Sequence, residues 1–157
     1  FFYKAKKLLQ PGGIIVFITS KEVTDSINEN KIRESLLGEL NLISSIRFPQ
    51  ETFHHAKTSV ITDLLVFQKP ILEKSSLNQN SREIDFLSSR KIAEENISKF
   101  YQSYPENLLG ELYLGKGYLG KETILVKAQK TLPEVFKDSF SILKNDYSKY
   151  ALNKLEN

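Results

Sequence analysis

The residues best placed to do chemistry lie in a polar loop between two expected strands, at residues 47–58. This loop carries two aromatic side chains, Phe48 and Phe53, which flank Pro49. In an open α/β sheet, ligands bind at the carboxyl ends of the strands, and the loop leaves a strand at such an end. An aromatic ring exposed there could present a flat apolar surface to a ligand. Both rings could instead pack in the core beneath the hairpin, and residue type alone does not decide between the two.

Other residues that could do chemistry have simpler explanations. His54 and His55 are the only histidines, and a structural metal site needs three or four ligands, so a solvated or DNA-facing loop explains this pair better. The glycines between Gly110 and Gly120 lack the spacing of a dinucleotide fingerprint and indicate turns. The tyrosines could stack on bases, although ordinary packing explains them: Tyr101, Tyr104, Tyr113 and Tyr118. A solvated helix face explains the spacing of three carboxylates: Asp25, Glu29 and Glu34.

The composition excludes several classes of protein. The chain has 157 residues, of which 40% are hydrophobic and 26% are charged, as in an ordinary globular domain. Its 22 basic and 19 acidic residues give a net charge of +3, so charge alone does not indicate nucleic acid. The absence of cysteine excludes disulfides, cysteine-ligated zinc and a thiol nucleophile, and it fits the reducing cytoplasm. The longest apolar run, at residues 14–18, is too short to span a membrane.

The first residues of the sequence have the pattern of a helix that is already under way. The sequence contains no methionine, and apolar residues recur at helical spacing from its first position. These residues are Phe1, Phe2, Ala5, Leu8 and Leu9. The pattern indicates an internal fragment of a longer chain, and a processed mature protein is the alternative.

The first 70 residues alternate expected helices and strands, as in an α/β fold. A helix at residues 1–10 ends at Pro11-Gly12-Gly13, where the glycines supply the positive φ of a tight turn. The β-branched and aromatic run at residues 14–18 predicts a central strand that is buried on both faces. The later elements expected here are a helix at 28–40, a strand at 41–48, a loop at 50–58 and a strand at 59–68. Because that loop is too short for a crossover helix, the last two strands should be antiparallel neighbours.

The second half of the sequence is more polar and less regular. Residues 71–90 are rich in serine and asparagine, and they indicate a linker or a long excursion. The elements expected beyond it are a helix at 92–104, turns at 105–120, a strand at 123–126 and a helix at 132–143. We therefore expect three parts, which are half of a doubly wound domain at 1–70, the linker at 71–90 and a small helical or α+β extension at 91–157.

Residues 1–70 resemble the later half of the N-6 adenine DNA methyltransferase domain. The resemblance is carried by a helix followed by PGGIIVFITS, then by KIRESLLGELNLISSIRFP and TFHHAKTSVITDLLVFQKP. In that family a helix and a Pro-Gly-Gly turn lead into the fifth strand, and the next two strands form a terminal hairpin. The family pattern around this hairpin matches Arg47, Phe48, Pro49, Phe53, Thr58 and Lys69. The segment YQSYPENLLG is similar to a stretch that follows the methylase core in large bacterial helicase-methylase proteins.

The resemblance implies a Rossmann-like, seven-stranded and mostly parallel sheet, of which this chain would supply the last third. The family binds S-adenosylmethionine at its first strand and holds the adenine amino group with an Asn-Pro-Pro-Tyr-type motif. Neither motif occurs in this sequence, so we expect no catalytic, cofactor-binding or metal-binding residue in it. The family's base-stacking aromatic would be Phe53, or Phe48 in an alternative alignment. The chain would then be an inactive fragment, and S-adenosylmethionine would bind only to the full-length parent protein.

DNA is the partner that the resemblance implies. Five side chains are expected around the carboxyl edge of the sheet, where they could meet phosphates: Lys21, Arg47, His54, His55 and Lys57. A sheet without its first strands leaves the strand at 14–18 without a neighbour. We therefore expect either self-association through this edge or its cover by residues 71–157. Two rival interpretations are a non-catalytic methylase-like scaffold that packs on a helicase or partner subunit and positions DNA, and a class I methyltransferase that acts on RNA or protein.

Overall fold

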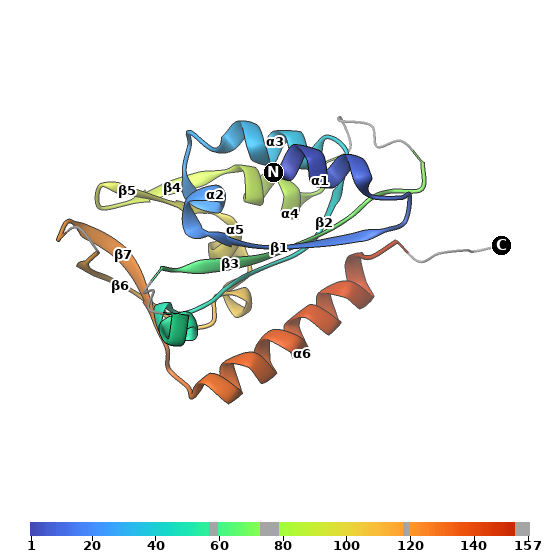
Figure 1. Cartoon of the computed structure of the whole chain (residues 1–157). Helices are drawn as coiled ribbons and strands as arrows, with labels where there is room; N and C mark the ends of the chain where they lie inside the picture. The colour runs from blue at the N-terminus through green and yellow to red at the C-terminus, as the bar shows by residue number, and fades with distance from the viewer. Residues whose placement is uncertain (57–59, 73–78, 118–119, 153–157) are drawn as a thin grey trace.

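The computed structural model describes residues 1–56, 60–72, 79–117 and 120–152 (Figure 1). These residues form a mixed α/β fold. Its α-helices are α1 (Phe2–Leu8), α2 (Lys21–Asp25), α3 (Asn30–Leu37), α4 (Ser81–Leu87), α5 (Phe100–Ser103) and α6 (Leu132–Tyr150), and its 3-10 helices are η1 (Gln50–Ala56) and η2 (Pro105–Asn107). Its strands are β1 (Ile14–Ser20), β2 (Asn41–Arg47), β3 (Thr62–Gln68), β4 (Ser89–Ile92), β5 (Glu95–Ser98), β6 (Glu111–Lys116) and β7 (Glu122–Lys127).

The main sheet has three strands in the order β1-β3-β2. The central strand β3 is antiparallel to both of its neighbours, so β1 and β2 run in the same direction. The expected antiparallel pairing of β2 with β3 is confirmed. The expectation that β1 is central is wrong, because β3 lies between β1 and β2. The loop between β2 and β3 was expected to hold no helix, but it forms η1, which is kinked at Phe53 and does not act as a crossover.

Strand β1 is buried on one face only, contrary to expectation. Phe17 is 5% exposed, whereas Ile14, Val16 and Ile18 are 40%, 53% and 63% exposed. Phe17 belongs to an apolar cluster with residues of α1, α3 and α4. These helices lie above the sheet in Figure 1, while α6 lies below the sheet and against β2. Among the described residues, no strand pairs with the outer edge of β1. Within the described part of residues 71–157, no strand covers this edge, and the alternative expectation, self-association through it, stays a prediction.

The turn between α1 and β1 is tied to the end of β3. Gly12 has a φ of 76°, a conformation that glycine adopts without steric cost. Its N–H donates to the carbonyl oxygen of Lys69 over 2.8 Å, and the N–H of Lys69 donates to the carbonyl oxygen of Gly13 over 2.9 Å. The Pro-Gly-Gly turn thus fixes where β1 begins relative to β3.

Two apolar clusters lie on the two faces of the main sheet. The larger one joins residues from the first and second halves of the chain: Phe17, Leu36, Leu37, Leu40, Leu42, Leu65, Phe67, Phe86, Phe100 and Tyr101. Phe86 belongs to α4, which lies within the segment expected to be a linker, and its side chain is fully buried. The smaller cluster is built on Ile46, Phe48 and Val135, and it joins α6 to β2.

The second half of the chain departs most from the expected elements. The helix expected at 92–104 is replaced by the ribbon β4–β5, a two-stranded antiparallel sheet, and by the four-residue helix α5. The ribbon turns at Ala93, whose φ of 52° is uncommon for a residue other than glycine. The strand expected at 123–126 is present as β7, and it pairs with β6, which lies in the segment expected to be rich in turns. Helix α6 begins at the expected residue and runs seven residues further, to Tyr150.

No helix within the described residues combines the length and the apolar composition that are needed to cross a membrane.

Candidate functional site

The carboxyl ends of β1 and β2 lie at the same edge of the main sheet, because both strands are antiparallel to β3. Helix α2 follows β1 there, and η1 follows β2. The ribbons β4–β5 and β6–β7 lie at this end of the sheet as well, on the left of Figure 1. The edge that the sequence singled out as a ligand site is therefore surrounded by four short elements.

Arg47 lies at this edge but is not available to a phosphate, contrary to expectation. Its side chain is 1% exposed. Nε and Nη2 donate to the carboxylate of Asp63 over 2.8 and 2.7 Å, and Nη1 and Nη2 donate to that of Asp25 over 2.8 and 2.9 Å. The guanidinium also stacks on the ring of Tyr101, with 4.4 Å from Cζ to the ring centroid. We call Arg47, Asp25, Asp63 and Tyr101 the Arg47 cluster.

Burial dominates the electrostatics of the Arg47 cluster. Burial raises the pKa of Asp25, against the opposite effect of Arg47. Burial alone would lower the pKa of Arg47, but Asp63 and Asp25 outweigh it, and that pKa is raised well above its ordinary value. Burial also raises the pKa of Tyr101 well above its ordinary value. Arg47 therefore stays charged, and Tyr101 stays a neutral phenol whose hydroxyl lies 2.7 Å from the hydroxyl of Ser45.

The two carboxylates of the Arg47 cluster were missed from the sequence. Asp25 was expected on a solvated helix face, but it is 6% exposed and accepts the N–H of Ser98 over 2.9 Å. Asp63 stands directly opposite Arg47 in the register of β2 and β3. Opposite charges directly across an antiparallel pair stabilise it, so this pair could have been found once the hairpin was expected. Nothing in the local sequence indicates that Asp25 joins it.

Lys21 also lies at the expected edge, and its ammonium group is occupied. Its Nζ lies 2.9 Å from Oε2 of Glu95, 3.1 Å from Oγ1 of Thr123 and 3.1 Å from the carbonyl oxygen of Ile124. Since an ammonium has three donors, none remains for DNA in this conformation. The hydrogen bonds from Thr123, Ile124 and Lys21 lower the pKa of Glu95, although burial works in the opposite direction. Lys21 thus fastens both ribbons to the end of β1.

The two phenylalanines of the loop have different environments. Phe48 is 5% exposed and belongs to the smaller apolar cluster, where its ring centroid lies 6.0 Å from that of Phe136. Phe53 is half-buried and lies at a kink within η1, with φ −111° and ψ 26°. The two rings meet edge to face, with 6.3 Å between centroids. Packing explains Phe48, while part of the Phe53 side chain reaches the surface.

Of the two histidines and Lys57, only His54 has a described side chain. His54 is exposed on η1. The backbone of His55 belongs to the same 3-10 helix, but its side chain lies outside the described part of the structure, as does all of Lys57. Of the five expected DNA-contacting side chains, only His54 is described as open to solvent at this edge.

A second buried polar network joins α6 to β2, η2 and α4. Asp146 accepts hydrogen bonds from Oγ of Ser44 over 2.6 Å and from Nδ2 of Asn107 over 3.0 Å. The Nη2 atom of Arg82 lies 3.4 Å from the same carboxylate. The Arg82 guanidinium also covers the ring of Tyr150, with 3.8 Å from Cζ to the centroid. These contacts hold α4, η2 and α6 on β2.

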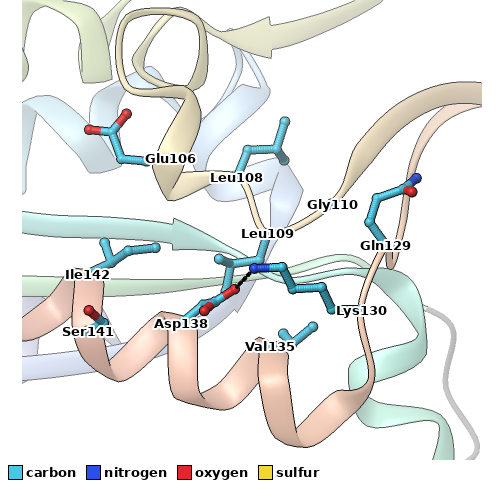
Figure 2. Close-up of a pocket in the computed structure, with 10 residues that line it drawn as sticks. All are labelled: Glu106, Leu108, Leu109, Gly110, Gln129, Lys130, Val135, Asp138, Ser141 and Ile142. Carbon is cyan, nitrogen blue, oxygen red and sulfur yellow. Dashed lines mark hydrogen bonds and ion pairs between the residues drawn. The ribbon is translucent and has the colours of Figure 1, made fainter.

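A hollow of about 390 Å³ lies between α6 and the segment that joins η2 to β6 (Figure 2). Its floor includes Leu109, Val135 and Ile142, which also pack around Phe48. Across it, Nζ of Lys130 lies 2.6 Å from Oδ2 of Asp138, as the dashed line in Figure 2 marks. The hollow thus has an apolar floor and an exposed ion pair, and no nucleophile is paired with a base in it.

Two glycines of the glycine-rich segment at 110–120 lie in close contact with the rest of the β6–β7 region. Gly110 and Gly115 belong to the β6–β7 region, where a Cβ atom would meet the Lys127 carbonyl oxygen at 2.5 Å and Leu125 at 2.8 Å, respectively. They make room for packing within the ribbon and do not form a turn between a strand and a helix. Within the described residues, no group of three or more His, Cys, Asp or Glu side chains could hold a metal ion.

No known protein family, curated protein or solved structure matches the chain in comparisons of its sequence and fold.

Proposed function

We propose that this chain is a fragment of a bacterial, cytoplasmic, S-adenosylmethionine-dependent DNA adenine N-6 methyltransferase, and that it comprises the carboxyl-terminal part of the catalytic domain and a following module. The observation that carries the proposal is the direction of the three strands. β1 and β2 are parallel, and the following strand β3 is antiparallel to both. This is the arrangement expected at the end of a mostly parallel, Rossmann-like sheet that closes with an antiparallel hairpin. The residues of the family pattern, from Arg47 to Phe53, lie at the carboxyl end of β2.

The position of Phe53 supports a role in holding the target base. A base that is methylated within duplex DNA must leave the stack, which costs a few kcal/mol, and stacking on an aromatic ring offsets part of this cost. Phe53 is partly open on a loop at the ligand edge, and the buried Phe48 supports it from below. In the parent protein, Phe53 would stack on the extruded adenine, and residues outside this sequence would bind the cofactor and the amino group.

A non-catalytic scaffold is the second candidate function, and one observation favours it. Lys21 and Arg47, two cations expected to face DNA, are both committed to contacts within the chain. A methylase-like scaffold that packs on a helicase or partner subunit needs these internal contacts, but it needs no cations at the base-binding edge. The two candidates differ in whether the parent protein transfers methyl groups.

Cofactor binding and methyl transfer separate these candidates. We expect calorimetric titration of the 157-residue chain with S-adenosylmethionine to give no binding signal. The reason is that its sequence lacks the glycine-rich turn with which the family binds this cofactor. The full-length parent should transfer a labelled methyl group to N6 of adenine in DNA. A micromolar binding isotherm for the chain would show a cofactor site within it. A parent that binds the cofactor and DNA but methylates no adenine would favour the scaffold.

Strand β1 supplies a further prediction about association. Its outer edge is unpaired within the described residues, and Ile14, Val16 and Ile18 are exposed beside it. Because an apolar strand edge pairs with whatever strand is available, we expect the 157-residue chain to self-associate in light scattering. Val16→Lys should reduce the association by placing a charge on this face. The matched control is Ile84→Lys, a change at an exposed position on α4. A wild-type chain that stays monomeric over a wide range of concentration would contradict the prediction.

A further inference from the structure

A second hollow, of about 410 Å³, lies between η1 and the β6–β7 ribbon. Its lining residues are Gln50, Glu51, Glu111, Tyr113 and Lys127. Gln50 and Glu51 begin the same 3-10 helix that carries Phe53. The hollow is therefore adjacent in the chain to the proposed base-stacking residue. Its lining is polar, charged and aromatic, whereas the hollow beside α6 has an aliphatic floor.

The ring of Tyr113 is held in place on two sides. Nε2 of Gln50 donates to the Tyr113 hydroxyl over 2.9 Å. A Cβ atom at Gly115 would lie 2.9 Å from Cε2 of Tyr113, so the ring lies directly against the glycine backbone. The residue nevertheless remains 37% exposed. An aromatic ring that is fixed before binding and still open to solvent loses little conformational freedom when a planar group stacks on it.

The rest of the lining favours a particular class of planar group. The carboxylate of Glu51 accepts the N–H of Ala128 over 3.2 Å, and that of Glu111 accepts from Nε2 of Gln129 over 2.7 Å. A carboxylate has further lone pairs and can accept from the exocyclic amino group of a base. Adenine and cytosine carry such a group, whereas thymine does not. Lys127 supplies a cation at the same hollow, where a backbone phosphate could lie.

We propose that this hollow holds a second base of single-stranded DNA, next to the base on Phe53, and that it prefers bases with an exocyclic amino group. Tyr113 stacks on the base, Glu51 and Glu111 accept from its amino group, and Lys127 contacts the adjacent phosphate. The choice of DNA as the ligand rests on the proposed function. The site would recognise a nucleotide that flanks the target adenine.

Fluorescence anisotropy with labelled single-stranded oligonucleotides of adenine, cytosine or thymine tests this inference in the 157-residue chain. The adenine and cytosine oligonucleotides should bind more tightly than the thymine oligonucleotide. Tyr113→Ala should weaken the binding of adenine by about tenfold, as loss of one aromatic stacking partner does. Tyr113→Phe should bind almost as the wild type does, because the stacking face remains. Glu111→Gln should reduce the preference for adenine over thymine.

A matched control and two outcomes make the test decisive. Tyr147→Ala removes an exposed tyrosine of α6 and should leave DNA binding unchanged. Thermal melting of each variant should show that it is folded at the temperature of the assay. The inference is overturned if Tyr113→Ala binds adenine as the wild type does, or if thymine binds as tightly as adenine. Binding that depends on Tyr113, in a parent without methyl transfer, would instead overturn the proposed function alone.

Discussion

Arg47→Ala should lower the free energy of unfolding by about 3–5 kcal/mol, because it removes the guanidinium that is hydrogen-bonded to two buried carboxylates. Asp25 and Asp63 are 6% and 0% exposed, and each carboxylate accepts two hydrogen bonds from the Arg47 guanidinium. Breaking a buried pair leaves an uncompensated charge, and here it would leave two carboxylates close together. Urea unfolding of the variant and the wild type measures the difference.

An exposed ion pair provides the control for this prediction. Lys130 and Asp138 lie 2.6 Å apart with side chains 56% and 38% exposed, and exposed pairs contribute at most about 1 kcal/mol. Lys130→Ala should therefore change the unfolding free energy little. If Arg47→Ala does not fold, Arg47→Lys should fold with lower stability, because an ammonium cannot reproduce the planar fork that spans both carboxylates. A loss for Arg47→Ala no larger than that for Lys130→Ala would contradict the account of this cluster.

Phe48→Ala should mainly lower stability, whereas Phe53→Ala should mainly lower activity. Phe48 is buried between Phe53 and Phe136, and truncation of a buried phenylalanine costs about 3–5 kcal/mol. Phe53 is partly exposed on η1, so its truncation should change the melting temperature little. In the full-length parent, Phe53→Ala should slow methyl transfer, and Phe48→Ala should retain the rate per folded molecule. Melting curves and transfer rates of both variants, measured side by side, separate packing from stacking.

The hairpin and its loop could be predicted from the sequence because the signals are local. The runs at 41–48 and 59–68 are apolar, and the loop between them is too short for a crossover, so the antiparallel pairing follows. The placement of β3 between β1 and β2 could not be predicted in this way. It depends on which edges of the strands are occupied, and this is not encoded within any single strand.

The second half shows how an apolar pattern can predict the core without predicting the local conformation. Ile92, Ile97, Phe100 and Tyr101 have helical spacing and were expected in one helix. Ile97, Phe100 and Tyr101 are indeed buried, but Ile97 lies on β5 and the two aromatic residues on α5. Burial follows from hydrophobicity, whereas the choice between helix and ribbon depends on the turn at Ala93 and on docking to α2.

The loop with Phe53 follows the carboxyl end of β2 as predicted, but the environment of the nearby cations differs from the prediction. The carboxyl edge, Phe53 and its loop could be identified because strand ends and aromatic loops are visible in the sequence. Lys21 and Arg47 were expected to face DNA because they lie at the expected ligand edge of the sheet. Their partners Glu95 and Asp25 are distant in the sequence, so only the folded chain brings these charges together.

The rate of methyl transfer by the full-length Phe53→Ala variant, normalised to the folded fraction, tests the central claim most directly. Loss of one base-stacking ring is worth about 1–3 kcal/mol, so the rate should fall by about tenfold to a hundredfold. Phe53→Tyr and Phe53→Trp should be mild, because both keep an aromatic face. The account predicts this loss with a nearly unchanged melting temperature. A variant that melts early but has a normal rate per folded molecule would contradict it, because Phe53 would then serve packing alone.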